Sequence, residues 1–175
     1  MLDKLQGKID MTDTMTPEQR HRCMAAVKGK DTKPELIVRK YLFSRGLRYR
    51  LHDKKLPGKP DMVLKKYRTV VFIDGCFWHG HEGCRFFKLP KSNEFFWQQK
   101  IKNNKARDVS NDYVLQTEGW RVIRVWECEI KNLKSRELVL DKLYREIISP
   151  EFTKITERNE PPAIAAEPEM PYGVR

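Results

Sequence analysis

The pattern of hydrophobic and polar positions predicts four helices and four strands. Helical patterns cover residues 16–28, 32–45, 93–118 (continuous or broken once) and 135–148. Segments rich in β-branched and aromatic residues, which are typical of strands, cover residues 47–51, 61–64, 69–74 and 120–126. The third of these, TVVFID, is almost continuously apolar, as expected for a central strand that is buried on both faces.

Local signals mark where the helices begin and end. Thr16-Pro17 and the Thr32-x-x-Glu35 pattern are typical starts, because a Thr side chain can cap free backbone N–H groups. Gly46 and Gly119 are placed to end helices, and Ser135 to begin the last one. The apolar sides of the second and last helices are expected to be Leu36, Val38, Tyr41 and Leu42, and Leu138, Leu143, Tyr144 and Ile147.

The order of elements, ααβββαβα, predicts one α/β domain with a mixed central sheet flanked by helices. We place this domain at residues 16–149. Residues 1–15 lack periodicity and are expected to be flexible. The segment 150–175 shifts to Pro, Ala and Glu and is expected to be disordered.

Charge points to a polyanionic partner. The 175 residues include 35 Lys and Arg against 24 Asp and Glu, a net charge of +11, which favours nucleic acid, although solubility alone is an alternative explanation. No apolar run approaches the ~18 residues that span a bilayer, and the first residues lack the apolar core of a secretory signal. We therefore expect a cytoplasmic protein, associated with the nucleoid, without a membrane partner.

Three cysteines and a histidine have the character of a metal site. Cys76, His81 and Cys84 follow the central strand closely, and Cys128 follows the last strand. Thiolates and imidazole are the ligands of structural Zn²⁺, and four of them complete a tetrahedral set. The alternative is three free cysteines in the core with His81 on the surface. His79, two residues before His81, is then left for chemistry or for a structural hydrogen bond.

Carboxylates mark a second candidate site. Asp61 precedes one strand and Asp74 ends the next, so the two could hold Mg²⁺, although Pro-Asp is also a common turn dipeptide. Glu35 and Asp108 are further acidic candidates. Glu35 could equally be the reciprocal half of a capping box, and Asp108 a solvent-facing helix residue.

Aromatic residues gather on either side of the cysteine-rich loop: Phe77, Trp78, Phe95, Phe96 and Trp97. Rings beside a basic surface can insert between DNA bases, and the basic run 100–105 follows them directly. Core packing is the alternative for this set.

Four stretches together resemble the very-short-patch-repair (Vsr) mismatch endonucleases. They are TMTPEQRHRCMAAVKGKDTKPE, FIDGCFWHGHEGC, FFWQQKIKNNKARD and GWRVIRVWECEI, and with the Asp61 strand the resemblance covers residues 11–148. It implies a restriction-endonuclease-like fold of the PD-(D/E)xK type, with catalytic Mg²⁺ and a separate structural Zn²⁺. It also implies nicking of DNA 5′ to the thymine of a T:G mismatch, the product of 5-methylcytosine deamination.

The resemblance also assigns roles to residues. Asp61 matches the metal-binding aspartate, the Ile73 carbonyl a second Mg²⁺ ligand, and His79 the catalytic histidine. Glu35 and Asp108 match supporting acidic residues. The zinc ligands correspond to Cys76, His81, Cys84 and Cys128. The rings that enter the DNA beside the mismatch correspond to Phe77, Trp78 and Trp97.

The chain departs from the family pattern at two places. Some members carry Thr-His where this chain has Ile73-Asp74, so Asp74 either adds a metal ligand or replaces a phosphate-contacting histidine. One extra residue lies between His81 and Cys84. Two other functions stay open: a non-catalytic zinc-stapled protein that binds distorted DNA, and an endonuclease of the same fold with another specificity. An asymmetric mismatch favours a monomer.

Overall fold

The computed structural model describes residues 16–90 and 93–149, so the expectations for residues 1–15 and 150–175 concern parts of the chain outside these ranges. The helices are α1 (Pro17–Ala25), α2 (Lys33–Ser44), α3 (Glu94–Thr117), α4 (Glu127–Lys131) and α5 (Arg136–Ile148), with one 3-10 turn, η1 (Lys65–Tyr67). The strands are β1 (Arg50–Leu51), β2 (Met62–Leu64), β3 (Thr69–Asp74) and β4 (Arg121–Trp126). None of the described helices is long and apolar enough to cross a membrane.

The four strands form one mixed sheet in the order β1-β2-β3-β4. β1 and β3 each pair antiparallel with β2, whereas β3 and β4 run parallel with Asp74 opposite Trp126. Parallel neighbours need a crossover, and α3 supplies it. The predicted α/β class with a mixed sheet is therefore confirmed.

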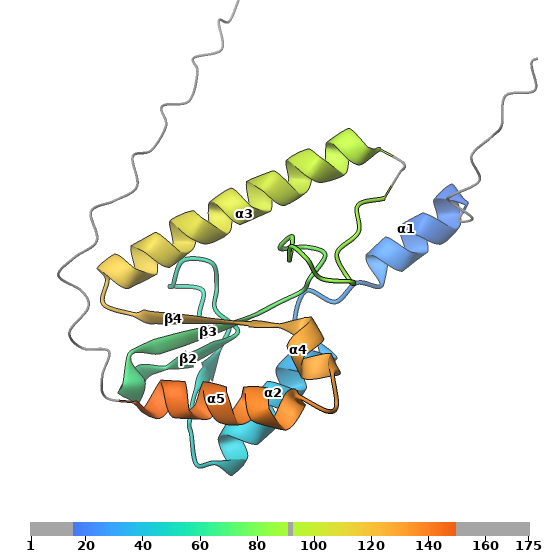
Figure 1. Ribbon diagram of the computed structural model, residues 1–175. Coiled ribbons are helices and arrows are strands. Elements are labelled where there is room, and N and C mark those ends of the chain that lie inside the picture. The colour runs from blue at the N-terminus through green and yellow to red at the C-terminus, as the bar shows by residue number, and fades with distance from the viewer. Residues whose placement is uncertain (1–15, 91–92, 150–175) are drawn as a thin grey trace, which may run out of the picture.

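Helices cover both faces of the sheet (Figure 1): α2 and α5 lie on one side and the long α3 crosses the other. Alternation along β3 serves both layers, because Val71 belongs to the core under α2 and α5, while Val70 and Phe72 pack with Leu115 of α3. The central strand is thus buried on both faces, as TVVFID predicts. The same alternation points Asp74 to the α3 side, two residues after Phe72.

The helix boundaries follow the local signals. Thr16 and Thr32 both form complete capping boxes, with Gln19 and Glu35 as their partners. α2 ends before Gly46, whose φ of +84° suits glycine, and Gly119 (φ +77°) follows α3 in the same way.

Several boundaries differ from expectation. The strand expected over 47–51 shrinks to two residues, because Leu47 is still part of the helix ending and donates its N–H to the Leu42 carbonyl at 3.0 Å. Helix α1 stops at Ala25 rather than Lys28, and α3 runs without a break. Helix α4 was not anticipated. It starts where the Glu129 carboxylate accepts the N–H of Trp126.

Two expectations about helix faces and one about a side-chain cap are wrong, although the last helix does begin after Ser135. The Ser135 side chain makes no cap, since the chain around it already turns in helical geometry after Asn132. Leu36 and Leu138, placed on apolar faces, are 42% and 73% exposed. The buried positions of the last helix are Leu140, Leu143 and Ile147, so the apolar stripe is rotated by about half a turn from Leu138.

Candidate active site and metal centre

Parallel pairing of β3 and β4 brings the distant cysteines together. Asp74 and Trp126 lie opposite each other at the ends of the two strands, and Cys76 and Cys128 each follow two residues later. The loop after β3 then turns back, as the His81 N–H donates to the Cys76 carbonyl at 2.9 Å. Cys128, 52 positions after Cys76 in the sequence, therefore becomes its neighbour through one strand pair.

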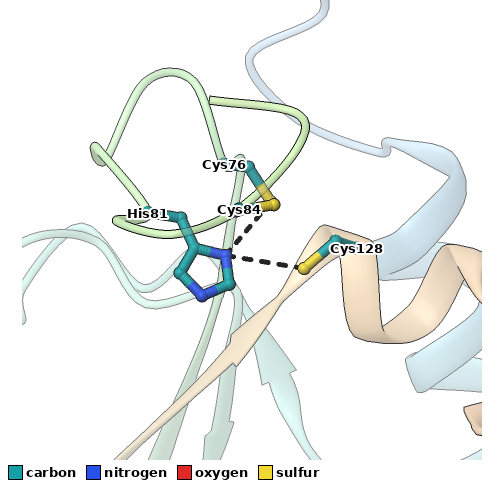
Figure 2. Close-up of side chains that lie close together, drawn as sticks. All are labelled: Cys76, His81, Cys84 and Cys128. Carbon is teal, nitrogen blue, oxygen red and sulfur yellow. Dashed lines mark hydrogen bonds between the residues drawn. The ribbon is translucent and has the colours of Figure 1, made fainter. Parts of the chain in front are cut away.

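The four side chains gather in a geometry that suits a tetrahedral ion (Figure 2). The ligand atoms of Cys76, His81, Cys84 and Cys128 all lie within 4.8 Å of one another. Nδ1 of His81 is 3.5 Å from the sulfurs of both Cys76 and Cys128. Tetrahedral Zn²⁺ with ordinary bond lengths would separate sulfur and nitrogen by about 3.6 Å. The donor set and its spacing therefore fit a zinc-type ion.

The surroundings hold this set in place. The His81 ring stacks on Trp126, with centroids 4.0 Å apart and planes 4° from parallel. Burial raises the pKa of the Cys76 thiol to about 12, so a thiolate at that position requires a cation beside it. His81 is not on a remote surface, as the alternative reading required, but beside two of the sulfurs.

The carboxylates meet on the other side of the same loop, in a cleft of about 810 Å³. Its walls come from the α1–α2 segment, the start of α2, the residues before β2, and the end of β3 with its loop. The predicted residues that line it are Glu35, Asp61, Ile73, Asp74, Phe77, Trp78 and His79. Residues that are far apart in the sequence thus share one cleft.

Asp61 is fixed by the antiparallel pairing of β2 with β3. Its Oδ2 accepts the N–H of Ile73 at 2.7 Å, which places the carboxylate beside the Ile73 backbone. Burial raises the pKa of Asp61 to about 6, against the hydrogen bond from Ile73, and the negative charges of Glu35 and Asp74 add to the rise. The site therefore concentrates negative charge that a bound cation would relieve.

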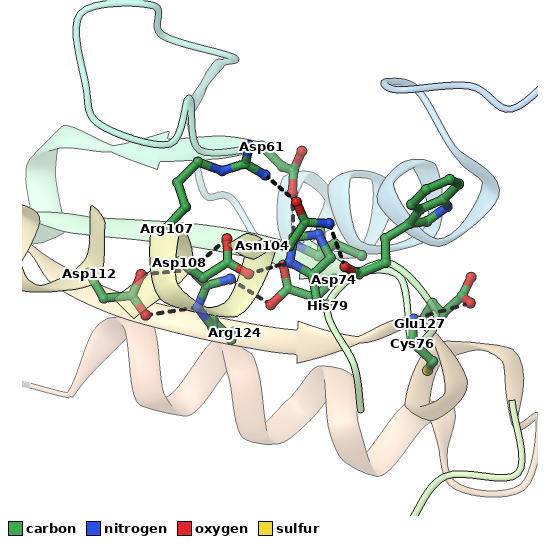
Figure 3. Close-up of polar contacts among 12 residues, drawn as sticks. Asp61, Asp74, Cys76, His79, Asn104, Arg107, Asp108, Asp112, Arg124 and Glu127 are labelled. Carbon is green, nitrogen blue, oxygen red and sulfur yellow. Dashed lines mark hydrogen bonds and ion pairs between the residues drawn. The ribbon is translucent and has the colours of Figure 1, made fainter. Parts of the chain in front are cut away.

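His79 and Asp108 form a close pair (Figure 3). The Nδ1–H of His79 points to Asp108 Oδ2 at 2.6 Å, and Asp74 Oδ1 lies 3.7 Å from the same nitrogen. Burial opposes the charged imidazole, but the hydrogen bond to Asp108 and the charge of Asp74 outweigh it and raise the pKa of His79. The pKa of Asp108 is lowered by this bond despite burial. Asp108 thus faces His79 rather than solvent.

Asp74 has a partner that was not identified from the sequence. Its buried carboxylate accepts a hydrogen bond from Arg124 Nη1 at 2.6 Å, and Arg124 also pairs with Asp112. Nearby, the Asn104 side chain donates to the Trp78 carbonyl at 2.9 Å. An arginine within the apolar run WRVIRVW was the available signal, since a charge on a buried strand needs a partner.

Glu35 is held by the start of its own helix and by Arg39, a partner that was not identified from the sequence. It completes the capping box of Thr32, and it is 4% exposed. Its Oε2 pairs with buried Arg39 at 2.5 Å and lies 3.8 Å from His52, whose Nδ1 is 3.8 Å from Asp61 Oδ1. Glu35 therefore has the capping role and also lies at the edge of the acidic cluster.

Four of the five aromatic residues form one cluster rather than separate core contacts. Phe77 contacts both Trp78 and Trp97 edge-on, with centroids 5.2 Å apart in each case, and Phe96 contacts Trp97 at 5.2 Å. Phe95 is 80% exposed and Phe96 55% exposed. The rings join the metal loop to the first turn of α3, and part of the cluster faces solvent.

Comparisons with known proteins identify the family of this chain. Residues 12–85 match the family model described as DNA mismatch endonuclease Vsr. The chain is 51% identical over 137 residues to the Type II nicking enzyme V.NmeAIP of Neisseria meningitidis, covering 78% of this chain and 97% of the relative. It is 49% identical to the Type II nicking enzyme V.XorIIP of Xanthomonas oryzae, over 80% of this chain and 99% of that protein. It is 40% identical to the DNA mismatch endonuclease Vsr of Escherichia coli, over 78% of this chain and 85% of the relative. On the strength of these matches over nearly the full length of the relatives, the chain belongs to the Vsr family of DNA mismatch endonucleases.

Proposed function

We propose that this protein is a Mg²⁺-dependent endonuclease that nicks DNA 5′ to the thymine of a T:G mismatch. Family membership supports DNA endonuclease activity as the general reaction. The observation that carries the proposal is the convergence of Asp61 and of His79, which Asp108 orients, on one cleft beside the aromatic cluster. A carboxylate that can hold a metal ion and an oriented imidazole that can act on water suit the hydrolysis of a phosphodiester.

Asp61 and the backbone carbonyl of Ile73 are the groups that would hold Mg²⁺. The fit rests on the buried, negatively charged surroundings of Asp61 and on its contact with the Ile73 backbone. When bound, the ion polarises the scissile phosphate and lowers the pKa of coordinated water. Asp61, held by the Ile73 N–H, would supply the carboxylate that orients this ion.

His79 would orient the attacking water or accept its proton. Because Asp108 accepts the Nδ1–H, Nε2 is the ring nitrogen with a free lone pair when the imidazole is neutral. The same bond fixes the plane of the ring. Cys76, His81, Cys84 and Cys128 would bind Zn²⁺, which anchors the loop that carries His79 between the two parallel strands.

The rim of the cleft supports DNA as the substrate. Four lysines of the rim, Lys28, Lys30, Lys33 and Lys59, line the cleft together with the carboxylates. Cations around an acidic centre suit the phosphates on either side of a scissile bond. Phe77, Trp78 and Trp97 would enter the base stack, which costs least where a mismatch already weakens it.

Preference for T:G is the finer part of the proposal. The relative from Escherichia coli is named a mismatch endonuclease, and other relatives are named nicking enzymes. An endonuclease of the same fold with another specificity is therefore the second candidate. We further propose that the protein acts as a monomer, because a single mismatch has no twofold symmetry to match a dimer. We place its action in the cytoplasm.

A nicking assay tests these statements. Duplexes with one T:G mismatch in varied contexts, and a fully paired duplex, would be incubated with Mg²⁺ or with EDTA. We expect Mg²⁺-dependent cleavage of the thymine strand alone. Asp61→Asn should abolish nicking while DNA affinity is kept, and Asp141→Asn, on α5 outside the cleft, serves as the matched control.

The other outcomes separate the alternatives. Tight binding without nicking under any condition would support a non-catalytic protein that binds distorted DNA. Cleavage of paired DNA at the same rate would indicate a different specificity. Normal nicking by Asp61→Asn would contradict the assignment of the metal-binding residue.

A further inference from the structure

Arg124 lies among three carboxylates, those of Asp74, Asp108 and Asp112, between β3, β4 and α3. Its Nε and Nη2 donate to the two oxygens of Asp112 at 2.8 and 2.7 Å, and its Nη1 donates to Asp74 Oδ2 at 2.6 Å. Nη2 also lies 3.9 Å from Asp108 Oδ1. The guanidinium carbon lies 4.6 Å from the centroid of the Phe72 ring, and Phe72 is the residue opposite Arg124 in the sheet. These contacts fix both its position and its orientation (Figure 3).

Two of the carboxylates around Arg124, those of Asp108 and Asp74, lie close enough to His79 to compete for its Nδ1–H. Asp108 Oδ2 is 2.6 Å from His79 Nδ1, and Asp74 Oδ1 is 3.7 Å from the same atom. The Asp74 side chain is only 4% exposed, so water cannot replace a lost counter-charge there. Without Arg124, a buried carboxylate with full charge would attract the Nδ1–H away from Asp108.

We propose that Arg124 is a positioning residue for nicking: it neutralises Asp74, so that Asp108 alone holds His79 Nδ1 and the imidazole keeps its orientation in the cleft. This inference rests on the proposed function, in which His79 acts on the attacking water. Arg124 itself does not line the cleft and is not expected to touch DNA.

The same contacts assign Asp74 to this network rather than to the metal. One of its oxygens is engaged by Arg124 and the other faces His79. Asp61, in contrast, accepts the Ile73 N–H with its Oδ2, and its Oδ1 lies 3.8 Å from His52 Nδ1, which leaves this oxygen available to a cation. Asp74→Asn should therefore slow nicking only a few-fold, because Asp112 still anchors Arg124. A metal ligand would lose activity on the scale of Asp61→Asn.

The central experiment is a double-mutant cycle on single-turnover nicking of T:G DNA. Arg124→Met keeps the packing on Phe72 but removes the charge. We expect its nicking rate to fall roughly 100-fold, the scale for a catalytic group misplaced by about 1 Å, with DNA affinity little changed. Adding Asp74→Asn removes the rival carboxylate, and should restore the rate by about tenfold, as expected for residues in direct contact.

Two controls separate positioning from loss of folding. Arg45→Met also removes an arginine with a 2.8 Å ion pair, to Asp141, outside the cleft, and should nick at the wild-type rate. Arg124→Lys keeps the charge and should fold, and its rate should lie between those of the wild type and Arg124→Met. Thermal unfolding of each variant shows whether a slow rate follows stability instead.

Several results would overturn the proposal. They are a wild-type rate for Arg124→Met, no recovery in the double variant, an Arg124→Lys variant as slow as Arg124→Met, or inactivation by Asp74→Asn equal to that by Asp61→Asn.

A readout without DNA makes the proposal independent of the reaction. The ¹⁵N NMR signal of the His79 imidazole reports the hydrogen bond of Nδ1, and it should change in Arg124→Met and return toward wild type when Asp74→Asn is added. An unchanged signal would refute the inference even if nicking is lost. If wild-type protein nicks no duplex, the proposed function fails, while the NMR cycle still tests the positioning of His79.

Discussion

Gly80 lies between His79 and His81, and a methyl group there tests how tightly the metal loop packs on α3. Gly80 has φ +62°, and a Cβ at this position would lie 2.6 Å from the Cγ2 atom of Ile101. The other close atom belongs to the flexible end of Lys105, which can move away. Ile101 is 4% exposed and cannot. Gly83 in the same loop has φ +70° but nothing within 4 Å, so it is a matched control.

The structure allows the cost of the left-handed backbone to be separated from the cost of overpacking against Ile101. Each alanine would adopt a left-handed backbone, which costs about 1–2 kcal/mol. Gly80→Ala adds an overpacking cost of about 1–3 kcal/mol, which Gly83→Ala avoids. We therefore expect a loss in the free energy of unfolding of about 2–5 kcal/mol for Gly80→Ala and about 1–2 kcal/mol for Gly83→Ala.

Urea unfolding at equal, saturating zinc measures both losses, with bound metal determined for each variant. Nicking should also fall for Gly80→Ala, because the methyl group displaces the segment that carries His79. Ile101→Ala should cost less in the Gly80→Ala background than in the wild type, since the new methyl group occupies part of the space that it opens. Losses for the two glycine variants that agree within about 0.5 kcal/mol would refute the reasoning, because packing against Ile101 would then contribute nothing.

Three further predictions concern the metal, the core and a helix start. Cys128→Ser should reduce bound zinc measured by atomic emission from one ion per chain, and lower the thermal midpoint, because it removes one of four ligands; full zinc content in this variant would contradict the proposed ligand set. Leu143→Ala, at a site 2% exposed, should cost about 2–5 kcal/mol in urea unfolding, whereas Leu138→Ala, 73% exposed on the same helix, should cost under about 0.5 kcal/mol; equal losses would mean that the face of α5 is wrongly placed. Thr32→Ala should cost about 1 kcal/mol by loss of the capping box with Glu35, and an unchanged midpoint would show that the cap is dispensable.

Much of the architecture follows from local sequence. Capping boxes at Thr16 and Thr32 and glycines after α2 and α3 fix helix boundaries through backbone hydrogen bonds within a few residues. The continuous apolar run of β3 predicts a strand covered on both faces, because only such a strand can bury every side chain. The cysteines and histidine of the metal loop stand out by residue type alone, since clustered cysteines with a nearby histidine are typical of a metal site.

Where local signals were weak, tertiary packing decided. Leu36 and Leu138 fit an apolar stripe by spacing but lie outside the core, because the rotation of each helix is set by the sheet beneath it. Helix α4 has no long apolar pattern and forms where β4 ends beside the metal loop. The spacing of apolar residues along one helix carries no information on which face of that helix contacts the sheet.

The sequence by itself determined which residue types are available for chemistry, and only the tertiary structure decided which of them meet. Cys128 joins Cys76 because β3 and β4 run parallel in register, and Asp61 reaches Ile73 because β2 and β3 are antiparallel. The partnership of Arg124 with Asp74 and Asp112 depends on where α3 crosses the sheet. Interactions between residues 12 to 52 positions apart are set by strand register and helix placement, which local sequence does not encode.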